Sequence, residues 1–170
     1  MLETERILFR ELNHSDLEDL IEMDTNKEVL RFINPHKTVT EDEVPAGLER
    51  IISHYPTKQG LGIWATINKE GQEFMGWFCL KPPADTPEVE IGYRLKPLFW
   101  GKGYATEGAS RLRSYGLDEL KLEKVVAVTH PKHIASKNVL NKIGMNYIRE
   151  KENRFKGHPE PFVSYFSSSS

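Results

Sequence analysis

The segment between residues 95 and 104 constrains the fold most, because a strand pattern ends there and a helical pattern begins. Glu88 to Leu95 reads as a strand, and apolar residues recur at helical spacing from about 103 to 119. Gly101 and Gly103 lie between them and allow a sharp turn to which a ligand can come close. The first helical amides lack partners within the helix and lie at its positive end. The segment therefore predicts an anion site for phosphate or pyrophosphate, with Lys102 at its rim.

Two known phosphate-binding motifs do not fit this segment. A P-loop needs Ser or Thr after its lysine, but Gly103 follows Lys102. The Rossmann fingerprint needs Gly or Ala where Thr106 stands, and an acid at the end of the next strand, which here ends in Val128-Thr129-His130. A glycine turn that only reverses the chain remains an alternative to an anion site.

The remaining patterns predict a single α+β (mixed α/β) domain over residues 1–170. Predicted strands cover residues 6–12, 62–67, 73–81, 88–95, 124–129, 145–151 and 162–166, and predicted helices start near residues 15, 40, 103 and 134. Short connections between residues 62 and 95 indicate antiparallel pairing. Ser15 to Glu18 and Thr40 to Glu43 have the form of capping boxes, and Gly144 is placed to end the last helix. We expect the serines 167–170 to be a frayed tail.

Composition excludes several classes of protein. Lys and Arg number 23 against 25 Asp and Glu, a balance that argues against a nucleic-acid partner. A single cysteine, Cys79, excludes an intrachain disulfide and a cysteine-based zinc cluster, and it reads as a buried, inert thiol. The six histidines lack metal-ligand spacing, so no metal site is expected. No signal peptide or long apolar run is visible, which predicts a cytoplasmic protein with no membrane partner.

Three blocks of sequence together resemble a known family. Glu90 to Glu107 looks like the acetyl-CoA-binding segment of GNAT-type N-acetyltransferases, in particular the branch of the ribosomal-protein alanine N-acetyltransferases. His130 to Met145 and Glu3 to Arg10 are similar to further blocks of that branch, so the resemblance covers residues 3–166. Three positions depart from the pattern. Leu98 stands where many GNAT proteins carry Gln or Arg, although this branch often lacks them. His133 stands where the branch usually has Asn, and Met145 replaces the usual Phe.

The resemblance implies a twisted, mostly antiparallel sheet with one splayed pair of parallel strands, flanked by helices. The pantetheine arm of acetyl-CoA would lie between strands 88–95 and 124–129, and its pyrophosphate would rest on the glycine turn. The cofactor-binding residues that the resemblance implies are Tyr93, Arg94, Leu95, Gly101, Lys102, Gly103, Tyr104, Ala105, Thr106, His133 and Ser136. Most of these contacts would be made by the main chain, while Thr106 and His133 would contribute side chains.

The resemblance also implies transfer of an acetyl group to a primary amine by direct attack in a ternary complex. Glu90 is the candidate base, although a carboxylate with the usual pKa of ~4.3 would need apolar neighbours to raise it. Glu88 lies on the same strand face and is a second candidate. Ser136 is the candidate donor to the leaving thiolate, and Tyr147 is a weaker one. Alternatively, the two glutamates are ordinary solvated carboxylates on a strand, and the serine only caps its helix.

The acceptor is left open by the sequence. We expect its specificity to come from residues 24–60 and 153–161, where acidic and basic side chains are mixed. A protein N-terminus, a polyamine, an aminoglycoside-like compound and an amino acid all remain candidates, and the protein could be a monomer or a homodimer. A non-catalytic acyl-CoA sensor on the same fold is the main alternative function, and a nucleotide-binding protein is a third.

Overall fold

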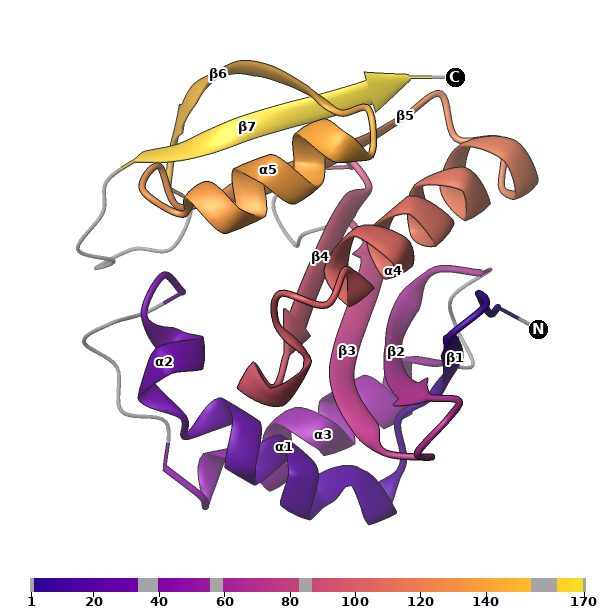
Figure 1. Ribbon diagram of the computed structural model, residues 1–170, viewed down its shortest axis with the longest axis vertical. Helices are drawn as coiled ribbons and strands as arrows, with labels where there is room; N and C mark the ends of the chain where they lie inside the picture. Colours follow the sequence, from indigo (N-terminus) through magenta and orange to yellow (C-terminus); the bar gives the residue numbers. More distant parts are fainter. Residues whose placement is uncertain (1, 34–39, 56–59, 83–86, 154–161, 170) are drawn as a thin grey trace.

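The computed structural model describes residues 2–33, 40–55, 60–82, 87–153 and 162–169 (Figure 1). Its strands are β1 (Ile7–Glu11), β2 (Gly62–Asn68), β3 (Phe74–Lys81), β4 (Glu90–Leu95), β5 (Lys124–Thr129), β6 (Asn146–Glu152) and β7 (Phe162–Ser169). They form one sheet in the order β1-β2-β3-β4-β5-β7-β6. All neighbours are antiparallel except β4 and β5, which are parallel. The predicted mixed sheet with one parallel pair is confirmed.

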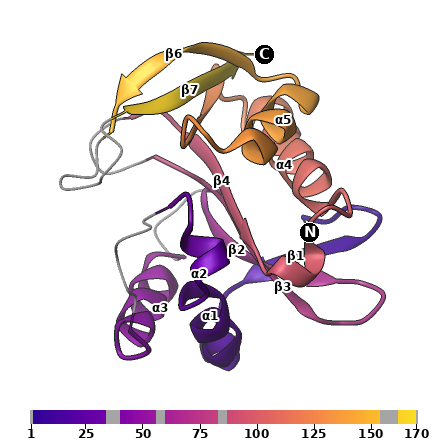
Figure 2. The ribbon, with the colours of Figure 1, turned by 60° about the vertical axis from the view of Figure 1, so that its left-hand side comes forward.

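The helices cover both faces of the sheet (Figure 2). They are α1 (Leu17–Asp24), α2 (Lys27–Leu30), α3 (Glu43–His54), α4 (Tyr104–Ser114) and α5 (Ile134–Lys142). Helices α4 and α5 pack on one face through a core that includes Phe78, Leu112 and Leu140. Helices α1 to α3 pack on the other face through a second core, which includes Met23 and Leu48. The sheet therefore separates two layers of helices, and a site at a gap between its strands is accessible from both layers.

The parallel strands β4 and β5 pair only at their beginning. Glu90 and Val126 are their only register partners in the described part of the chain, and the Val126 N–H donates to the carbonyl of Val89 at 2.9 Å. Beyond this point β4 runs away from β5 toward α1 (Figure 1). The splay predicted for this strand pair is confirmed, and it leaves one edge of β4 without a neighbouring strand.

The start of α1 departs from the predicted capping box at Ser15. Asn13 is the capping residue: its side chain accepts from the N–H of Ser15, and the Asp16 carboxylate accepts from the N–H of Asn13 at 2.9 Å. Asp16 is buried and forms an ion pair with Arg10 at 2.6 Å, which anchors the turn to β1. The chain therefore turns two residues earlier than the Ser-x-x-Glu pattern indicates.

Two other predicted segments, the helix over 103–119 and the serine tail, also differ from expectation. The helix expected over 103–119 is α-helical only to Ser114 and continues as a π-helical turn, Tyr115–Glu119. The prediction of a frayed serine tail is wrong for Ser167 to Ser169, because these residues form the last part of β7 and pair with β5. Ser168 is buried, and its hydroxyl accepts from Arg113 at 2.9 Å. Ser170 lies outside the described residues.

Candidate active site

The glycine turn leads directly into α4. Gly101 has φ +73° and Gly103 has φ +86°, both in the left-handed region, where a side chain would strain the backbone. Gly103 is the N-cap of α4, so the N–H groups of Tyr104, Ala105 and Thr106 open the helix without helical partners. Lys102 is exposed at the rim. The turn thus has the geometry that the sequence predicts for an anion site.

A partly buried cluster of hydrogen bonds, which the sequence alone does not reveal, holds this turn against the segment before β1. Glu107 accepts hydrogen bonds from the Thr4 hydroxyl at 2.5 Å, the Arg6 N–H at 3.1 Å and Arg6 Nε at 2.7 Å. Arg6 Nη1 also donates to the carbonyl of Lys102 at 3.1 Å, and its guanidinium lies 4.3 Å from the centre of the Tyr104 ring. The backbone of the turn is therefore fixed by residues about 100 positions away. The side chain of Tyr104 belongs to this packing, so only its N–H can face a ligand.

The connection from β4 to the turn is anchored by aromatic side chains. Phe99 is buried in the core next to Tyr104, with ring centres 5.9 Å apart. The indole N–H of Trp100 donates to the carbonyl of Leu95 at 2.8 Å. That carbonyl, one of the main-chain groups expected to meet the cofactor, is therefore already used inside the protein.

The exposed edge of β4 is formed by alternate residues. Because the carbonyl of Val89 faces β5, strand geometry directs the main-chain groups of Tyr93 to the same edge. The main-chain groups of Arg94 face β3 instead, because the N–H of Lys96, two residues further along the chain, donates to the carbonyl of Met75. The Arg94 side chain lies over the Trp77 ring and forms an ion pair with Asp24 at 2.5 Å. The expected cofactor contact at Arg94 therefore does not fit the strand, whereas the one at Tyr93 does.

Tyr93 and Ser136 come together across the splay. The Tyr93 hydroxyl donates to Ser136 Oγ at 3.4 Å, so a residue of β4 meets the first turn of α5. Burial raises the pKa of Tyr93, which keeps its hydroxyl protonated at neutral pH. Because Tyr93 donates to Ser136, the serine can direct its own proton elsewhere.

The two candidate carboxylates differ in their surroundings. Glu88 accepts hydrogen bonds from Lys124 at 2.7 Å and from the Tyr165 hydroxyl at 2.9 Å, and the hydrogen bond from Lys124 is the main cause that lowers its pKa. A carboxylate held as an anion in this way is a poor base. Glu90 lies on the same face as Arg94, toward α1, because the alternate residues Ile91 and Tyr93 belong to the core under α4. Both carboxylates are partly exposed, but Glu88 is held by Lys124 and Tyr165, whereas Glu90 lies on the α1 side beside the splay.

The side chain of His133, expected to contribute to the cofactor site, takes part in an aromatic stack. Its ring stacks on Phe32, with centres 4.4 Å apart and an angle of 19° between the planes. Phe32 also contacts the His130 ring at 5.3 Å, and Arg31 lies over Phe32. Burial and the nearby charges of His130 and Arg31 lower the pKa of His133. The stack joins the segment after α2 to the start of α5 across the open side of the splay.

Other residues singled out in the sequence lie elsewhere. The ring of Tyr147 packs on Phe166, and its hydroxyl donates to Glu150 at 3.3 Å, so its contacts are within the β6–β7 ribbon. Cys79 is buried, and burial raises its pKa to about 12. Most of the predicted acceptor segment 153–161 lies outside the described residues. Within the described residues, no cluster of three or more metal-ligating side chains forms and no helix is long and apolar enough to span a membrane.

The geometry agrees with comparison to known proteins. A family profile described as an acetyltransferase (GNAT) domain matches residues 6–146. The chain belongs to the GNAT acetyltransferase family. Among curated relatives of this GNAT enzyme, an FsC-acetyl coenzyme A-N(2)-transacetylase of Aspergillus fumigatus is 30% identical over 166 residues, 93% of this chain and 70% of that protein. The enzyme is therefore an acetyl-CoA-dependent acyltransferase.

Solved structures show the same fold. A GNAT-family acetyltransferase from Bacillus anthracis has a TM-score of 0.82 at 24% identity, with 99% of this chain and 97% of that chain covered. A spermidine N-acetyltransferase from Vibrio cholerae, in complex with CoA and spermine, has a TM-score of 0.75 at 16% identity, with 98% and 96% covered. In this GNAT enzyme the unpaired edge at Tyr93 suits the amides of an extended pantetheine arm, and the helix start after Gly103 suits its pyrophosphate.

Proposed function

We propose that this enzyme transfers the acetyl group of acetyl-CoA to a primary amine by direct attack in a ternary complex, with Glu90 as the base. The observation that carries the proposal is the splay itself, because it exposes the edge of β4 between two different faces. Glu90 lies on the face toward α1, and the Tyr93–Ser136 pair lies on the face toward α5. An amine can therefore approach from one side of a thioester while its sulfur leaves toward the other.

The chemistry requires a proton to move on each side. A primary amine is mostly protonated at neutral pH, with a pKa of ~8 for an α-amine and ~10.4 for lysine. Glu90 accepts the proton that the nitrogen loses as the new C–N bond forms and the C–S bond breaks. The Ser136 hydroxyl, which accepts from Tyr93, donates toward the leaving thiolate. The names of the relatives, an N(2)-transacetylase and a spermidine N-acetyltransferase, support an amine as the acceptor class.

The cofactor would be held mainly by the main chain. We assign its pantetheine amides to the edge at Tyr93 and its pyrophosphate to the turn formed by Gly101, Lys102 and Gly103 and to the N–H groups of Tyr104, Ala105 and Thr106. The Thr106 hydroxyl would add a donor to a phosphate oxygen. When bound, acetyl-CoA supplies the acetyl group as a thioester.

The test is the rate of thiol release from acetyl-CoA with a panel of amines, for the wild type, Glu90→Gln and Glu88→Gln. We expect Glu90→Gln to lower kcat by about 10²-fold or more, since general bases contribute ~10²–10⁴-fold, with acetyl-CoA affinity unchanged. Glu88→Gln is the matched control: it should keep most of the activity but lower stability, because it weakens the contacts with Lys124 and Tyr165. Full activity of Glu90→Gln would remove the assigned base. Binding of acetyl-CoA without turnover of any amine would favour an acyl-CoA sensor.

A further inference from the structure

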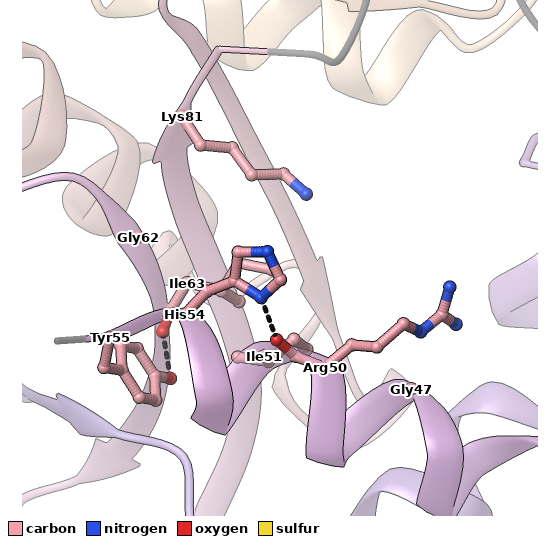
Figure 3. A pocket seen from close by; sticks show the side chains of 8 residues that line it. All are labelled: Gly47, Arg50, Ile51, His54, Tyr55, Gly62, Ile63 and Lys81. Carbon is pink, nitrogen blue, oxygen red and sulfur yellow. Dashed lines mark hydrogen bonds between the residues drawn. The ribbon is translucent and has the colours of Figure 1, made fainter. Parts of the chain in front are cut away.

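A hollow of about 370 Å³ lies between α3 and the neighbouring ends of β2 and β3. Its apolar wall includes Ile51, Tyr55 and Ile63, and its basic side chains are Arg50, His54 and Lys81. Figure 3 shows Lys81 reaching from β3 toward the space above α3, where His54 and Arg50 project. No acidic side chain is among the described residues that line it.

Two of the basic side chains, Arg50 and Lys81, form no ion pair among the described residues. Neither Arg50 nor Lys81 has a carboxylate within 4.0 Å in the parts of the chain that the structure describes. Arg50 Nε donates to the carbonyl of Ala46 at 3.2 Å, which leaves its outer nitrogens for another acceptor. His54 Nδ1 is bonded to the carbonyl of Arg50, so its Nε2 is turned away from that carbonyl. The hollow is therefore a site of positive potential with an apolar wall.

The apolar wall is rigid and uncharged. The Tyr55 hydroxyl donates to the carbonyl of Ile63 at 2.5 Å and accepts from the N–H of Leu12 at 2.9 Å. Burial raises the pKa of Tyr55 to about 12, so the phenol brings no negative charge at neutral pH. Among the described lining residues, a ligand in this hollow therefore meets a fixed apolar wall and the positive charges of Arg50 and Lys81.

The hollow lies on the same face of the sheet as Glu90. Lys81 is the register partner of Glu90, and Ile63 aligns with Cys79, which aligns in turn with Gly92. Neighbouring strands lie ~4.8 Å apart, so the hollow begins one strand from Glu90 and reaches about 10 Å from it. A group bonded to an amine at Glu90 through a short chain can therefore reach Lys81 and Arg50.

We propose that this hollow binds a carboxylate of the acceptor, so that the preferred substrate is an amine with a carboxylate ~5–10 Å from its nitrogen. This inference rests on the proposed function, because it places the reacting amine at Glu90. Arg50 and Lys81 hold the carboxylate through charge-assisted hydrogen bonds. A polyamine would instead bring a second ammonium against three basic side chains, which selects against it.

The experiment compares 6-aminohexanoate, hexylamine and 1,6-diaminohexane as acceptors, because they share one chain length and differ at the far end. We expect kcat/KM for 6-aminohexanoate to exceed that of either other amine by about tenfold or more. The double variant Arg50→Met, Lys81→Met should reduce that ratio to near one. Lys142→Met, which removes one positive charge at an exposed site on α5, should leave the ratio unchanged. Any effect of these substitutions on Glu90 cancels in the ratio of kcat/KM values, since all three amines use the same base.

Equal use of the three amines, or a preference that survives in the double variant, would overturn the inference. If none of the amines is acetylated, the proposed function fails, and calorimetry on the CoA-loaded protein still decides the inference. Tighter binding of 6-aminohexanoate than of 1,6-diaminohexane, lost in the double variant, would support a carboxylate site. Equal binding of the two would overturn it.

Discussion

At the scale of single residues, Arg6 connects the start of the chain's first strand to the glycine turn, which we propose binds the pyrophosphate. It is a positioning residue, because it contacts the Lys102 carbonyl and Glu107 rather than any reacting group. Burial favours the protonated form of Glu107, but its hydrogen bonds from Thr4 and Arg6 lower its pKa overall. The pair is therefore charged at neutral pH and holds the turn in the left-handed conformation of its glycines.

We predict that Arg6→Gln raises KM for acetyl-CoA by about tenfold, equivalent to ~1.4 kcal/mol, with little change in kcat. The reason is that the turn loses its link to β1 while Glu90 is untouched. Steady-state kinetics with acetyl-CoA varied at saturating amine checks this. Arg111→Gln is the control on α4, since Arg111 pairs with Glu119 away from the turn. A fall in kcat at unchanged KM would contradict the positioning role.

His133 gives a second prediction, on pH. Its pKa lies below the ordinary 6.5 in the folded protein, so the unfolded chain binds this proton at higher pH than the native state does. Stability therefore decreases as the pH falls through about 6.5. We predict that His133→Asn is less stable than the wild type near pH ~7.5, because the stack on Phe32 is lost, and that this deficit shrinks near pH ~5.5. Thermal unfolding at both values measures it, and a deficit independent of pH would contradict the account.

Contacts between individual side chains are the features that the sequence predicts least well. Arg6 and Glu107 both stand in blocks that resemble the family, but nothing in a single sequence pairs residues so far apart. The same holds for Phe32 and His133, whose stack depends on how α2 lies against α5. The main chain of Arg94 faces β3 rather than the open edge, and strand pairing decides this, not the position of Arg94 in a motif.

At the scale of elements, α4 lies unusually close to the sheet at Gly108. A Cβ at this position would lie 2.5 Å from Cζ of Phe78, a fully buried ring in β3. The close contact sets the depth at which α4 packs, and hence the position of its first amides, which we propose bind the pyrophosphate. The apolar residues at helical spacing in the sequence indicate which face of α4 is buried, but they do not give the distance between α4 and β3.

We predict that Gly108→Ala lowers the free energy of unfolding by about 1–3 kcal/mol through overpacking, even though alanine favours helices by ~1 kcal/mol over glycine. Gly47→Ala on α3 is the matched control, because the nearest atom to its Cβ would be 4.0 Å away. It should stabilise the protein by up to ~1 kcal/mol. Urea unfolding midpoints measure both, and equal effects would contradict the close packing.

The types of the long elements followed from periodicity, while their ends did not. The serines that end β7 have no apolar pattern, and their order comes from pairing with β5 and from the Arg113 contact. The π-helical turn after α4 similarly depends on packing, with Gly116 and Leu117 buried. Such ends are decided by tertiary contacts that the local pattern does not contain.

At the scale of the whole molecule, the splay of β4 and β5 determines what the fold can bind. The seven strands were predicted from their own patterns, but the divergence of the one parallel pair came only from the family resemblance. The proposed function therefore requires acetyl-CoA to occupy that opening, between the Tyr93 edge and the glycine turn before α4.

Calorimetric titration with acetyl-CoA tests this most directly, with CoA, ATP and NAD as comparisons and thermal unfolding as a second readout. We predict one binding site per chain, competition by CoA, little binding of ATP or NAD, and a stabilisation of ~2.7 kcal/mol at 100 times the dissociation constant. Neither heat nor stabilisation at millimolar acetyl-CoA would contradict the assigned site.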